Sequence, residues 1–434
     1  MDKYLVVWPK SEEVMHINYH YTQLGECVDY LDKFFPGQIV TLDCDINNED
    51  IIKFIKENGI KKVIMQVNYE NAQNAFGMCN SIKSVFVEIP VLAYGNIANR
   101  LPKLFLDSKF DAIHTDGDAE VCMKSFIRDY ETDEDISEIQ SKLKGANIIR
   151  DGQFISTEPG KYILPDSWGM SKPEDVPIDE YDKIKGKDRY ILNISRGCPF
   201  GCSHCLIQLT EGRMERRRSI DNARKTIEEV KEKYKHIKIW AANFTLDKKY
   251  VSAFCDMMKE SNPEVTWECA TRVDLVRDEE MLRQMYEGGC RQISLGIESL
   301  NNKELIDTKD FKVDELSAAI ARIQNNGIGV KGCVMLGMPN QTKESIISTL
   351  RFLRDRNVII RPTIYTPYHD LPEDIQISDL GKFNRKTYEN NNVNGVSSQQ
   401  LLELVSYPYN FEEILGIPKM DKKDKQPSDS GENR

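Results

Sequence analysis

Short apolar runs alternate with amphipathic stretches along the first 132 residues of the chain. The apolar runs have the length of single strands, and the stretches between them repeat apolar residues at helical spacing. The predicted strands are residues 4–8, 38–43, 62–67, 90–94 and 110–114, and the predicted helices are residues 24–35, 49–57, 71–85, 98–107 and 119–129. This alternation predicts an α/β domain with a doubly wound parallel sheet, which usually binds a ligand beyond the carboxyl ends of its strands.

The pattern changes between residues 133 and 189, where Glu, Asp, Lys, Gly and Pro accumulate. We predict a linker there, with a hairpin turn at residues 150–153. A second alternation covers residues 190–370, with strands expected near residues 190–196, 237–242, 265–270, 292–297, 329–336 and 359–366. Six parallel strand-helix units predict a partial (β/α)6 barrel of the TIM type, with its reactive groups at the C-terminal ends of the strands. Residues 371–420 are predicted to form a C-terminal extension and residues 421–434 a disordered tail.

Composition and charge narrow the possible partners. The 434 residues contain 58 Lys and Arg against 69 Asp and Glu, a formal net charge of -11. This acidic balance disfavours nucleic-acid binding and favours a small-molecule substrate. The apolar runs are far shorter than the roughly 20 residues that span a bilayer, and the first residues lack the apolar region of a signal peptide. We therefore expect a cytoplasmic protein without a membrane partner.

The spacing of the cysteines is the most informative chemical feature. In a reducing compartment, the eleven cysteines favour metal binding or catalysis over a disulfide framework. Cys198, Cys202 and Cys205 lie within eight residues, directly after the first strand of the second unit. Glycine and proline at residues 197, 199 and 201 keep this segment irregular, so the three sulfurs can converge. The other eight cysteines are scattered and are expected to be small buried residues.

Three thiolates favour an iron-sulfur cluster over a structural zinc site. A structural zinc site needs four ligands, and the only candidate for the fourth, His204, adjoins Cys205 in an awkward geometry. An iron-sulfur cluster with one open iron suits three cysteines. A zinc site and a chance grouping of cysteines remain as alternatives.

The Cys-x3-Cys-x2-Cys spacing at the end of a first barrel strand resembles the signature of the radical S-adenosylmethionine (SAM) enzymes. The resemblance implies that Cys198, Cys202 and Cys205 hold a 4Fe-4S cluster whose fourth iron chelates the amino and carboxylate groups of SAM. One-electron reduction would then release methionine and a 5'-deoxyadenosyl radical. An electron donor such as flavodoxin or ferredoxin is implied as a partner.

Further matches to the family run through the second unit in order. They imply SAM contacts by Phe200, His204, Ala241, Ala242, Asn243, Arg272, Glu298, Ser299 and Gly337. The backbone at 241–243 would meet the amino group, Arg272, Glu298 and Ser299 would lie near the carboxylate and ribose, and Gly337 near the adenine. The alternative for Arg272 and Glu298 is an ordinary ion pair at the barrel mouth. The basic run at 216–218 is either a solvated turn or an anion-binding site.

The order of the two units resembles the class of radical SAM enzymes that carries a cobalamin-binding domain ahead of the barrel. Many members of that class transfer a methyl group from methylcobalamin to an unactivated carbon. The candidate residues for cobalamin or the domain interface are Asn68, Tyr94, Gly95 and Asn96. The motif Asp-x-His-x-x-Gly is absent, and Ala-Tyr-Gly-Asn at 93–96 replaces the usual Gly-Gly. A vestigial domain of the same fold is the alternative to cobalamin binding.

Substrate contacts are expected at the end of the sixth strand of the second unit. The candidates are Tyr365, Tyr368, His369 and Asp370, and the alternative role of this segment is closure of the open barrel edge. No residue is assigned to hydrogen transfer. The first functional hypothesis is cobalamin-dependent C-methylation of a small metabolite. The alternatives are a cobalamin-free dehydratase, epimerase or rearrangement enzyme acting on a sugar or related polyol, and a non-enzymatic iron-sulfur or zinc binding module.

Overall fold

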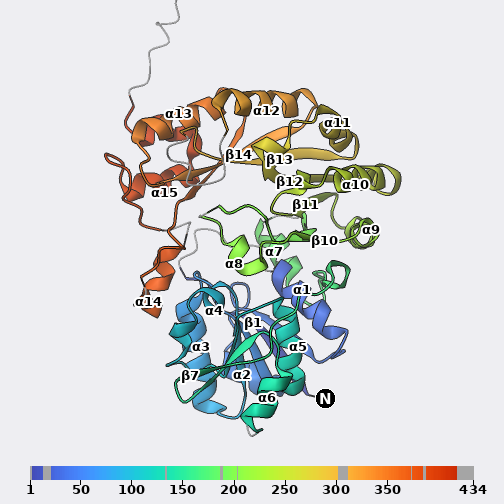
Figure 1. Ribbon diagram of the computed structural model, residues 1–434, viewed down its shortest axis with the longest axis vertical. Coiled ribbons are helices and arrows are strands. Elements are labelled where there is room, and N and C mark those ends of the chain that lie inside the picture. The colour runs from blue at the N-terminus through green and yellow to red at the C-terminus, as the bar shows by residue number, and fades with distance from the viewer. Residues whose placement is uncertain are drawn as a thin grey trace, which may run out of the picture.

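The structure is a computed structural model that describes residues 2–12, 21–131, 134–185, 189–202, 204–301, 311–372, 374–384 and 388–417. The predicted tail, residues 421–434, lies outside the described residues. The described residues form two large sheets, one in each half, and a small two-stranded sheet. Figure 1 shows the two halves as units stacked along the longest axis.

The first sheet has seven strands in the order β2-β1-β3-β4-β5-β6-β7. Five of them are parallel: β1 (Lys3–Trp8), β2 (Ile39–Asp43), β3 (Ile60–Gln66), β4 (Val91–Tyr94) and β5 (Ala112–His114). Leu5 and Val7 pack with helices α2 (Ile51–Asn58) and α3 (Ala72–Val85). Val6 and Trp8 point to the other face, toward α1 (Tyr21–Asp32) and α5 (Ala119–Asp129). The predicted doubly wound sheet is confirmed.

Two segments of this unit differ from the sequence prediction. The helix expected at residues 98–107 is a short helix α4 (Asn96–Arg100) followed by a 3-10 turn (Pro102–Phe105), because Pro102 cannot continue an α-helix. The residues expected as a linker contribute β6 (Ala146–Arg150) and β7 (Gln153–Ser156), which extend the first sheet in the antiparallel direction. The hairpin turn predicted between them is present at Asp151 and Gly152.

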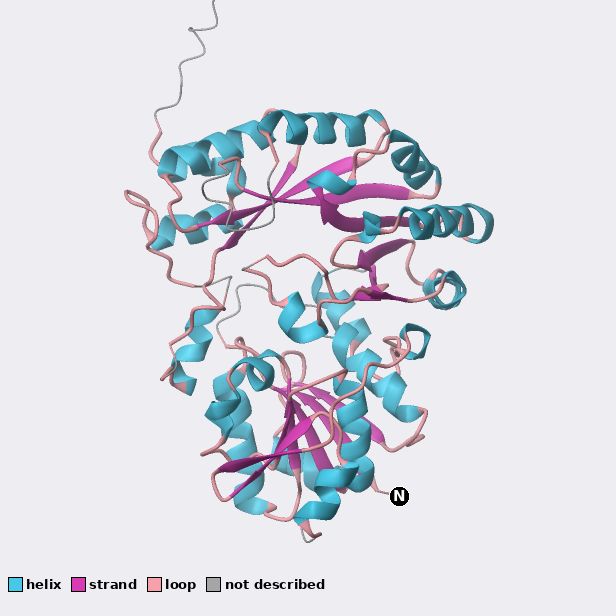
Figure 2. Ribbon diagram, viewed as in Figure 1, coloured by secondary structure: helices cyan, strands magenta, loops and turns pink. Residues whose placement is uncertain are grey.

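The second sheet has six parallel strands in the order β15-β14-β13-β12-β11-β8. The strands are β8 (Tyr190–Asn193), β11 (His236–Trp240), β12 (Thr266–Arg272), β13 (Cys290–Glu298), β14 (Gly329–Leu336) and β15 (Ile359–Ile364). Its helices are α9 (Ile220–Val230), α10 (Lys248–Ser261), α11 (Glu279–Glu287), α12 (Val313–Asn325) and α13 (Lys343–Arg354). Figure 2 shows α10 to α13 on the outer side of the strands. The predicted partial barrel is confirmed.

Short elements complete the described chain. Helix α6 (Ile136–Lys142) lies between α5 and β6 within the first unit, and α7 (Ile178–Lys185) lies between β7 and β8. The first barrel loop carries β9 (Ser195–Arg196), α8 (Ile207–Glu211) and β10 (Arg216–Arg217). The C-terminal helices are α14 (Ile377–Leu380), α15 (Ser398–Ser406) and α16 (Phe411–Ile414). No helix in the described ranges has both the length and the apolarity of a membrane span.

The chain returns to the first unit after the last barrel strand. Tyr368, Ile375 and Leu380 are buried in the hydrophobic core of the first unit. Leu401 and Phe411 pack instead with the helices and strands of the barrel. The segment between β15 and α15 therefore joins the two units a second time, in addition to the connection that precedes β8.

A buried lysine stabilises the C-terminal end of α5 in the first unit. The ammonium of Lys62 donates to the carbonyls of Phe126, Ile127 and Tyr130 at the end of α5, at 3.3, 2.8 and 2.5 Å. We expect Lys62→Met to lower the free energy of unfolding by about 2 kcal/mol, because these buried acceptors lose their donor. Denaturant unfolding measures the change. The exposed neighbour provides the control: Lys61→Met should cost less than about 0.5 kcal/mol, and equal losses would contradict the assignment.

Candidate active site

The loop that carries the three cysteines is held at its base by backbone contacts. Gly197 has a φ of +88°, and a Cβ there would lie 2.2 Å from the carbonyl oxygen of Met214, so the close approach of the two chains requires glycine. The amide of Gly197 donates to the buried Glu211 carboxylate at 2.9 Å, and the amide of Cys198 donates to the Gly212 carbonyl at 3.1 Å. The loop therefore leaves β9 and returns to its antiparallel partner β10 in a fixed path.

The three cysteines differ in exposure. Cys198 is buried, and Cys202 and Cys205 are half-buried. Burial raises the pKa of the Cys198 thiol, while the backbone amide of Phe200 acts in the opposite direction. The amide nitrogen of Asn243 lies 3.5 Å from the Cys198 sulfur.

The donor set fits a thiolate-bound iron-sulfur cluster. Three thiols on one irregular loop match the soft ligands that iron prefers. In the described part of the chain, no three Cys, His, Asp or Glu side chains are arranged as ligands of one metal ion. Convergence of the three sulfurs on one cluster therefore stays a prediction.

Several predicted SAM contacts gather beside the cysteine loop. The guanidinium of Arg272 lies 4.1 Å from the ring centroid of Phe200 and bonds Asp274 at 2.8 Å. His204 Nε2 lies 3.9 Å from a carboxylate oxygen of Glu298, the last residue of β13. The structure thus brings residues of the loop together with the C-terminal ends of β12 and β13, as the barrel prediction requires.

The other predicted SAM contacts follow the C-terminal ends of β11, β13 and β14. Some of their polar groups already form hydrogen bonds within the protein. Ser299 is fully buried, and its hydroxyl accepts from the amide of Asn301 at 3.1 Å. The Gly337 carbonyl accepts from Asn390 and Asn392, each at 2.8 Å. Ala241 is buried and Ala242 is half-buried. The two asparagines were missed by the sequence analysis, because they lie on an irregular segment that carries no periodic pattern.

The predicted substrate residues occupy two environments. Tyr365 is buried with Met335 at the end of the barrel strands, and His369 Nε2 lies 3.3 Å from the carbonyl oxygen of Cys205. Tyr368 instead packs its ring against Tyr69 of the first unit, with 4.6 Å between centroids. Asp370 is exposed. Arg100 donates to the His369 carbonyl at 2.6 Å, so this segment lies between the cysteine loop and the first unit.

Short side-chain hydrogen bonds join the carboxyl ends of β3 and β4 in the first unit. Asn68 Oδ1 accepts from the amide of Asn96 at 2.9 Å, and Asn96 Oδ1 accepts from the amide of Tyr69 at 3.2 Å. A Cβ on Gly95 would lie 2.6 Å from the Val67 carbonyl oxygen. Two of the four predicted cobalamin residues, Asn68 and Asn96, therefore bind each other across this edge.

Tyr94 bears directly on whether cobalamin fits. Its side chain is 5% exposed and packs between the sheet and helices α1 and α5. Its hydroxyl has no hydrogen-bond partner in the described chain, although buried polar groups are normally paired. An unpaired buried hydroxyl fits a bound polar cofactor. The ring of Tyr94 also fills the space beside β4. The first unit therefore fits a cofactor that lies across the strand ends, and it does not fit a nucleotide tail inserted beside β4.

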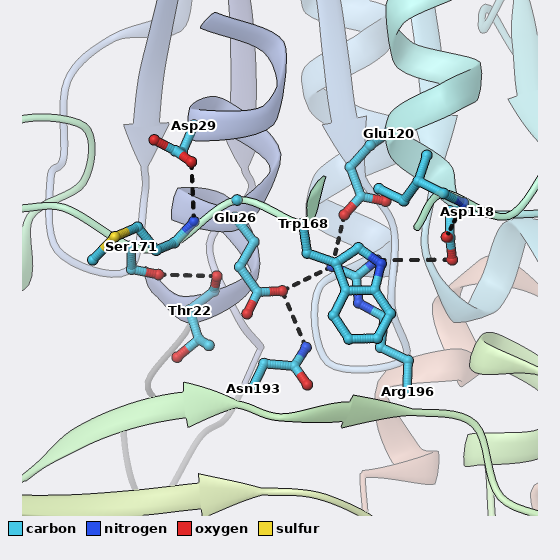
Figure 3. A network of polar contacts seen from close by, with 12 residues as sticks. Thr22, Glu26, Asp29, Asp118, Glu120, Trp168, Ser171, Asn193 and Arg196 are labelled. Carbon is cyan, nitrogen blue, oxygen red and sulfur yellow. Dashed lines mark hydrogen bonds and ion pairs between the residues drawn. The ribbon is translucent and has the colours of Figure 1, made fainter. Parts of the chain in front are cut away.

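A buried cluster of charges links the cysteine loop to the first unit (Figure 3). Arg196, two residues before the first cysteine, bonds Glu26 of α1 at 2.8 Å and Glu120 of α5 at 2.7 Å. Asp118 lies 3.8 Å from the same guanidinium, and Asn193 donates to Glu26 at 3.1 Å. These charges are buried, so the two units can dock only if the positive charge of Arg196 meets the carboxylates of the first unit.

The basic run at 216–218 belongs to the same junction, which corrects the expectation of a solvated turn. Arg216 makes a two-pronged contact with Asp118 at 2.7 and 3.0 Å. Arg218 is 2% exposed and donates to the carbonyls of Trp168 and Gly169. These guanidiniums bind groups of the protein itself. The one-dimensional pattern could not reveal this, because Asp118 lies 98 residues away in the chain.

Comparison with known families agrees with this geometry. Residues 192–353 match the model of the radical SAM superfamily. The match covers the partial barrel with its cysteine loop. It confirms the predicted resemblance to the radical SAM enzymes, with a 4Fe-4S cluster and SAM as the cofactors.

The chain is also similar in sequence to individual known proteins. The chain is 24% identical over 340 residues to an uncharacterized methyltransferase of Pyrococcus horikoshii, covering 75% of this chain and 71% of that protein. It is 26% identical over 253 residues to the anaerobic magnesium-protoporphyrin IX monomethyl ester cyclase of Rubrivivax gelatinosus. That alignment covers 51% of this chain and 45% of the cyclase, so the chain spans about half of the length of that relative.

Two solved structures share the whole arrangement. The radical SAM methyltransferase TsrM from Kitasatospora setae superposes with a TM-score of 0.67 at 12% identity, covering 84% of this chain and 74% of TsrM. The cobalamin-dependent radical SAM enzyme OxsB superposes with a TM-score of 0.69 at 16% identity, covering 95% of this chain and 56% of OxsB. At these identities the likeness shows the fold, which is a first parallel sheet followed by a radical SAM barrel.

The buried charge cluster makes a prediction for stability. Arg196→Met leaves Glu26 and Glu120 buried without their cation, and we expect the free energy of unfolding to fall by about 3 to 5 kcal/mol at pH 7. The exposed Arg283 also bonds two glutamates, so Arg283→Met is a matched control that should cost less than about 1 kcal/mol. Denaturant unfolding of both variants distinguishes them, and equal losses would show that the cluster does not hold the units together.

The same variant should show a pH dependence. Burial raises the pKa of Glu120, but Arg196 outweighs burial and holds that pKa below its ordinary value of 4.5. Glu120 therefore stabilises the wild-type protein above that pH, and this stabilisation is lost as the pH falls. Without Arg196 this stabilisation is absent. The difference in free energy of unfolding between the wild-type protein and Arg196→Met should therefore be largest near neutral pH and should shrink below pH 4.5. A deficit that is constant with pH would contradict this cause.

Proposed function

We propose that this enzyme uses cobalamin together with SAM to methylate a carbon of a small metabolite. The observation that carries the proposal is the position of the cysteine loop. Arg196 at its start binds the first unit, and the Cys205 carbonyl meets His369 of the segment that returns to the first unit. These contacts place the cysteine loop next to the first unit, which supports a transfer between two cofactors.

The cofactors supply the difficult chemistry, namely homolytic cleavage of SAM by the cluster and storage of a methyl group by cobalamin. In the proposal Cys198, Cys202 and Cys205 hold the cluster. Arg272 and Glu298 bind the charged groups of SAM at the barrel mouth. These residues were predicted from the sequence, and their assembly at the ends of β12 and β13 supports the roles.

The first unit would hold cobalamin across the carboxyl ends of β3 and β4. The side chains of Asn68 and Asn96 are polar groups at these strand ends. The hydroxyl of Tyr94, which has no partner in the described chain, is buried behind them. The methyltransferase names of several relatives support methyl transfer as the reaction. A small molecule as the substrate and an electron donor such as flavodoxin or ferredoxin belong to the same proposal.

One observation favours the second candidate, a cobalamin-free dehydratase, epimerase or rearrangement enzyme. The side chain of Tyr94 fills the space beside β4. If this space must be open for cobalamin, the first unit serves only as a scaffold for the barrel. The two candidates differ in their products from SAM, because only methyl transfer from SAM forms S-adenosylhomocysteine.

Anaerobic reconstitution with and without cobalamin separates the two candidates. Dithionite-reduced protein should form both deoxyadenosine and S-adenosylhomocysteine when hydroxocobalamin is supplied. Deoxyadenosine alone, with no bound cobalamin after gel filtration, would overturn the methylation proposal in favour of the second candidate. Failure to cleave SAM at all would contradict both.

The cysteine assignment makes a second prediction. The triple variant Cys198→Ala, Cys202→Ala and Cys205→Ala should retain at least tenfold less iron than the wild-type protein after reconstitution, since it has lost all three thiolate ligands. Cys122→Ala replaces a buried cysteine outside the loop and should retain the full iron content. Iron analysis and electron paramagnetic resonance of the reduced proteins measure both. Equal iron in the triple variant would place the cluster elsewhere.

Tyr94→Phe tests the cobalamin site without enlarging or shrinking the core. Removing an unpaired buried hydroxyl should raise the free energy of unfolding of the cofactor-free protein by about 1 kcal/mol. If that hydroxyl binds cobalamin, the affinity for hydroxocobalamin should fall by about tenfold, the value of a lost hydrogen bond of about 1.4 kcal/mol. Spectrophotometric titration measures the affinity. Greater stability with unchanged affinity would remove Tyr94 from the site.

A further inference from the structure

Alternate residues of the second sheet face opposite sides. Ile237 and Ile239 of β11 and Trp267 and Cys269 of β12 pack in the core with the surrounding helices. The residues between them point to the concave side of the sheet, which is the barrel lumen. Near the N-terminal ends of the strands these inward residues are charged, a feature that the proposed function does not use.

Four cations and one carboxylate make up this group, which we call the basic floor. It consists of Arg189 before β8, Lys238 of β11, Lys331 of β14, Arg361 of β15 and the carboxylate Glu268 of β12. Glu268 is buried and bonds Arg189 at 2.8 Å and Lys331 at 3.5 Å. Within the described residues, Lys238 and Arg361 form no ion pair within 4.0 Å.

The basic floor therefore holds more positive charge than its carboxylate compensates. The other carboxylate among the described inward-facing strand residues, Glu298, lies at the opposite end of the strands beside His204. Burial, the largest cause, together with the charges of Arg361, Arg189 and Lys331, lowers the pKa of Lys238 to about 8, while Glu268 acts in the opposite direction. Like charges gathered in one concave site cost stability and attract an anion.

The basic floor is also accessible. Arg361 is exposed, and Trp240, whose ring centroid lies 5.8 Å from the Lys238 ammonium, is 47% exposed. This exposed tryptophan, two residues after Lys238 on the same strand, offers a flat apolar surface beside that cation. This combination of an aromatic face with a few converging polar groups is typical of small-molecule sites.

We propose that the basic floor binds an anionic group of the substrate, a carboxylate or a phosphate, and so fixes the substrate in the lumen below the cysteine loop. This proposal rests on the proposed function in taking the lumen as the substrate site. Lys238 and Arg361 would bind the anion directly. Arg189 and Lys331 would act with Glu268, which holds them in place.

The proposal can be tested on the full chain without SAM or cobalamin. Reductive methylation with 13C-formaldehyde labels the lysines, and the Lys238→Arg variant assigns the Lys238 signal. Titration should place its midpoint near pH 8. Inorganic phosphate or acetate, at constant ionic strength, should move that midpoint upward by about one pH unit, because a bound anion stabilises the charged form.

The two anions show whether the anionic group of the substrate is a phosphate or a carboxylate. A response to phosphate supports a phosphorylated substrate, and a response to acetate alone supports a carboxylate. In either case Arg361→Met should weaken anion binding at least tenfold. The exposed Lys235, directly before β11, is the control, and Lys235→Met should leave binding unchanged. No response to either anion, or equal effects of the two variants, would overturn the proposal.

A stability measurement separates binding from a structural role. Lys238→Met removes one of several crowded cations, so its melting temperature should equal or exceed that of the wild-type protein. A lower melting temperature with unchanged anion affinity would mean that Lys238 serves only the fold, and would overturn the proposal. Anion binding that persists in a protein unable to transfer a methyl group would overturn the proposed function alone.

Discussion

A buried positive charge has to be compensated where it lies, and this constraint governs the junction of the two units. The guanidinium of Arg196 has little access to water, and its partners Glu26 and Glu120 come from two helices of the first unit. Because a guanidinium cannot lose its charge in practice, the barrel can dock only where those carboxylates meet it. The cysteine loop begins at the next residue, so the position of the proposed cluster follows from the same contact.

A second connection reinforces the first from the C-terminal side. The segment after β15 places Tyr368 against Tyr69 and brings His369 to the carbonyl of Cys205. The cysteine loop is thus held in two places. Arg196 at its start binds the first unit, and the segment after β15 contacts it at Cys205. Trp240 and Arg361 of the barrel strands are exposed, unlike the buried groups of the junction.

The sequence alone predicted what depends on local spacing. The strands at residues 4–8 and 329–336 and the helix at 119–129 agree with the structure because hydrophobic periodicity is a local signal. The cysteine spacing likewise lies within one loop. The broken helix after Arg100 had a visible signal in Pro102, which the sequence analysis did not use.

Contacts between distant segments could not be predicted in this way. Arg196 and Glu26 are 170 residues apart, and nothing in either neighbourhood indicates the pairing. The same holds for the basic floor, whose five residues come from five different strands or their ends. Each looks like an ordinary strand residue until the sheet curves and brings them together.

Docking of the two units depends on the coupling between Arg196 and its carboxylates, and a double-mutant cycle measures this coupling most directly. The free energies of unfolding of the wild-type protein, Arg196→Met, Glu120→Gln and the double variant give the coupling energy at pH 7. We predict a coupling of about 2 to 3 kcal/mol, because Glu120→Gln removes one of the carboxylates that Arg196→Met leaves uncompensated. Additive losses within about 0.5 kcal/mol would contradict the claim that this contact joins the two units.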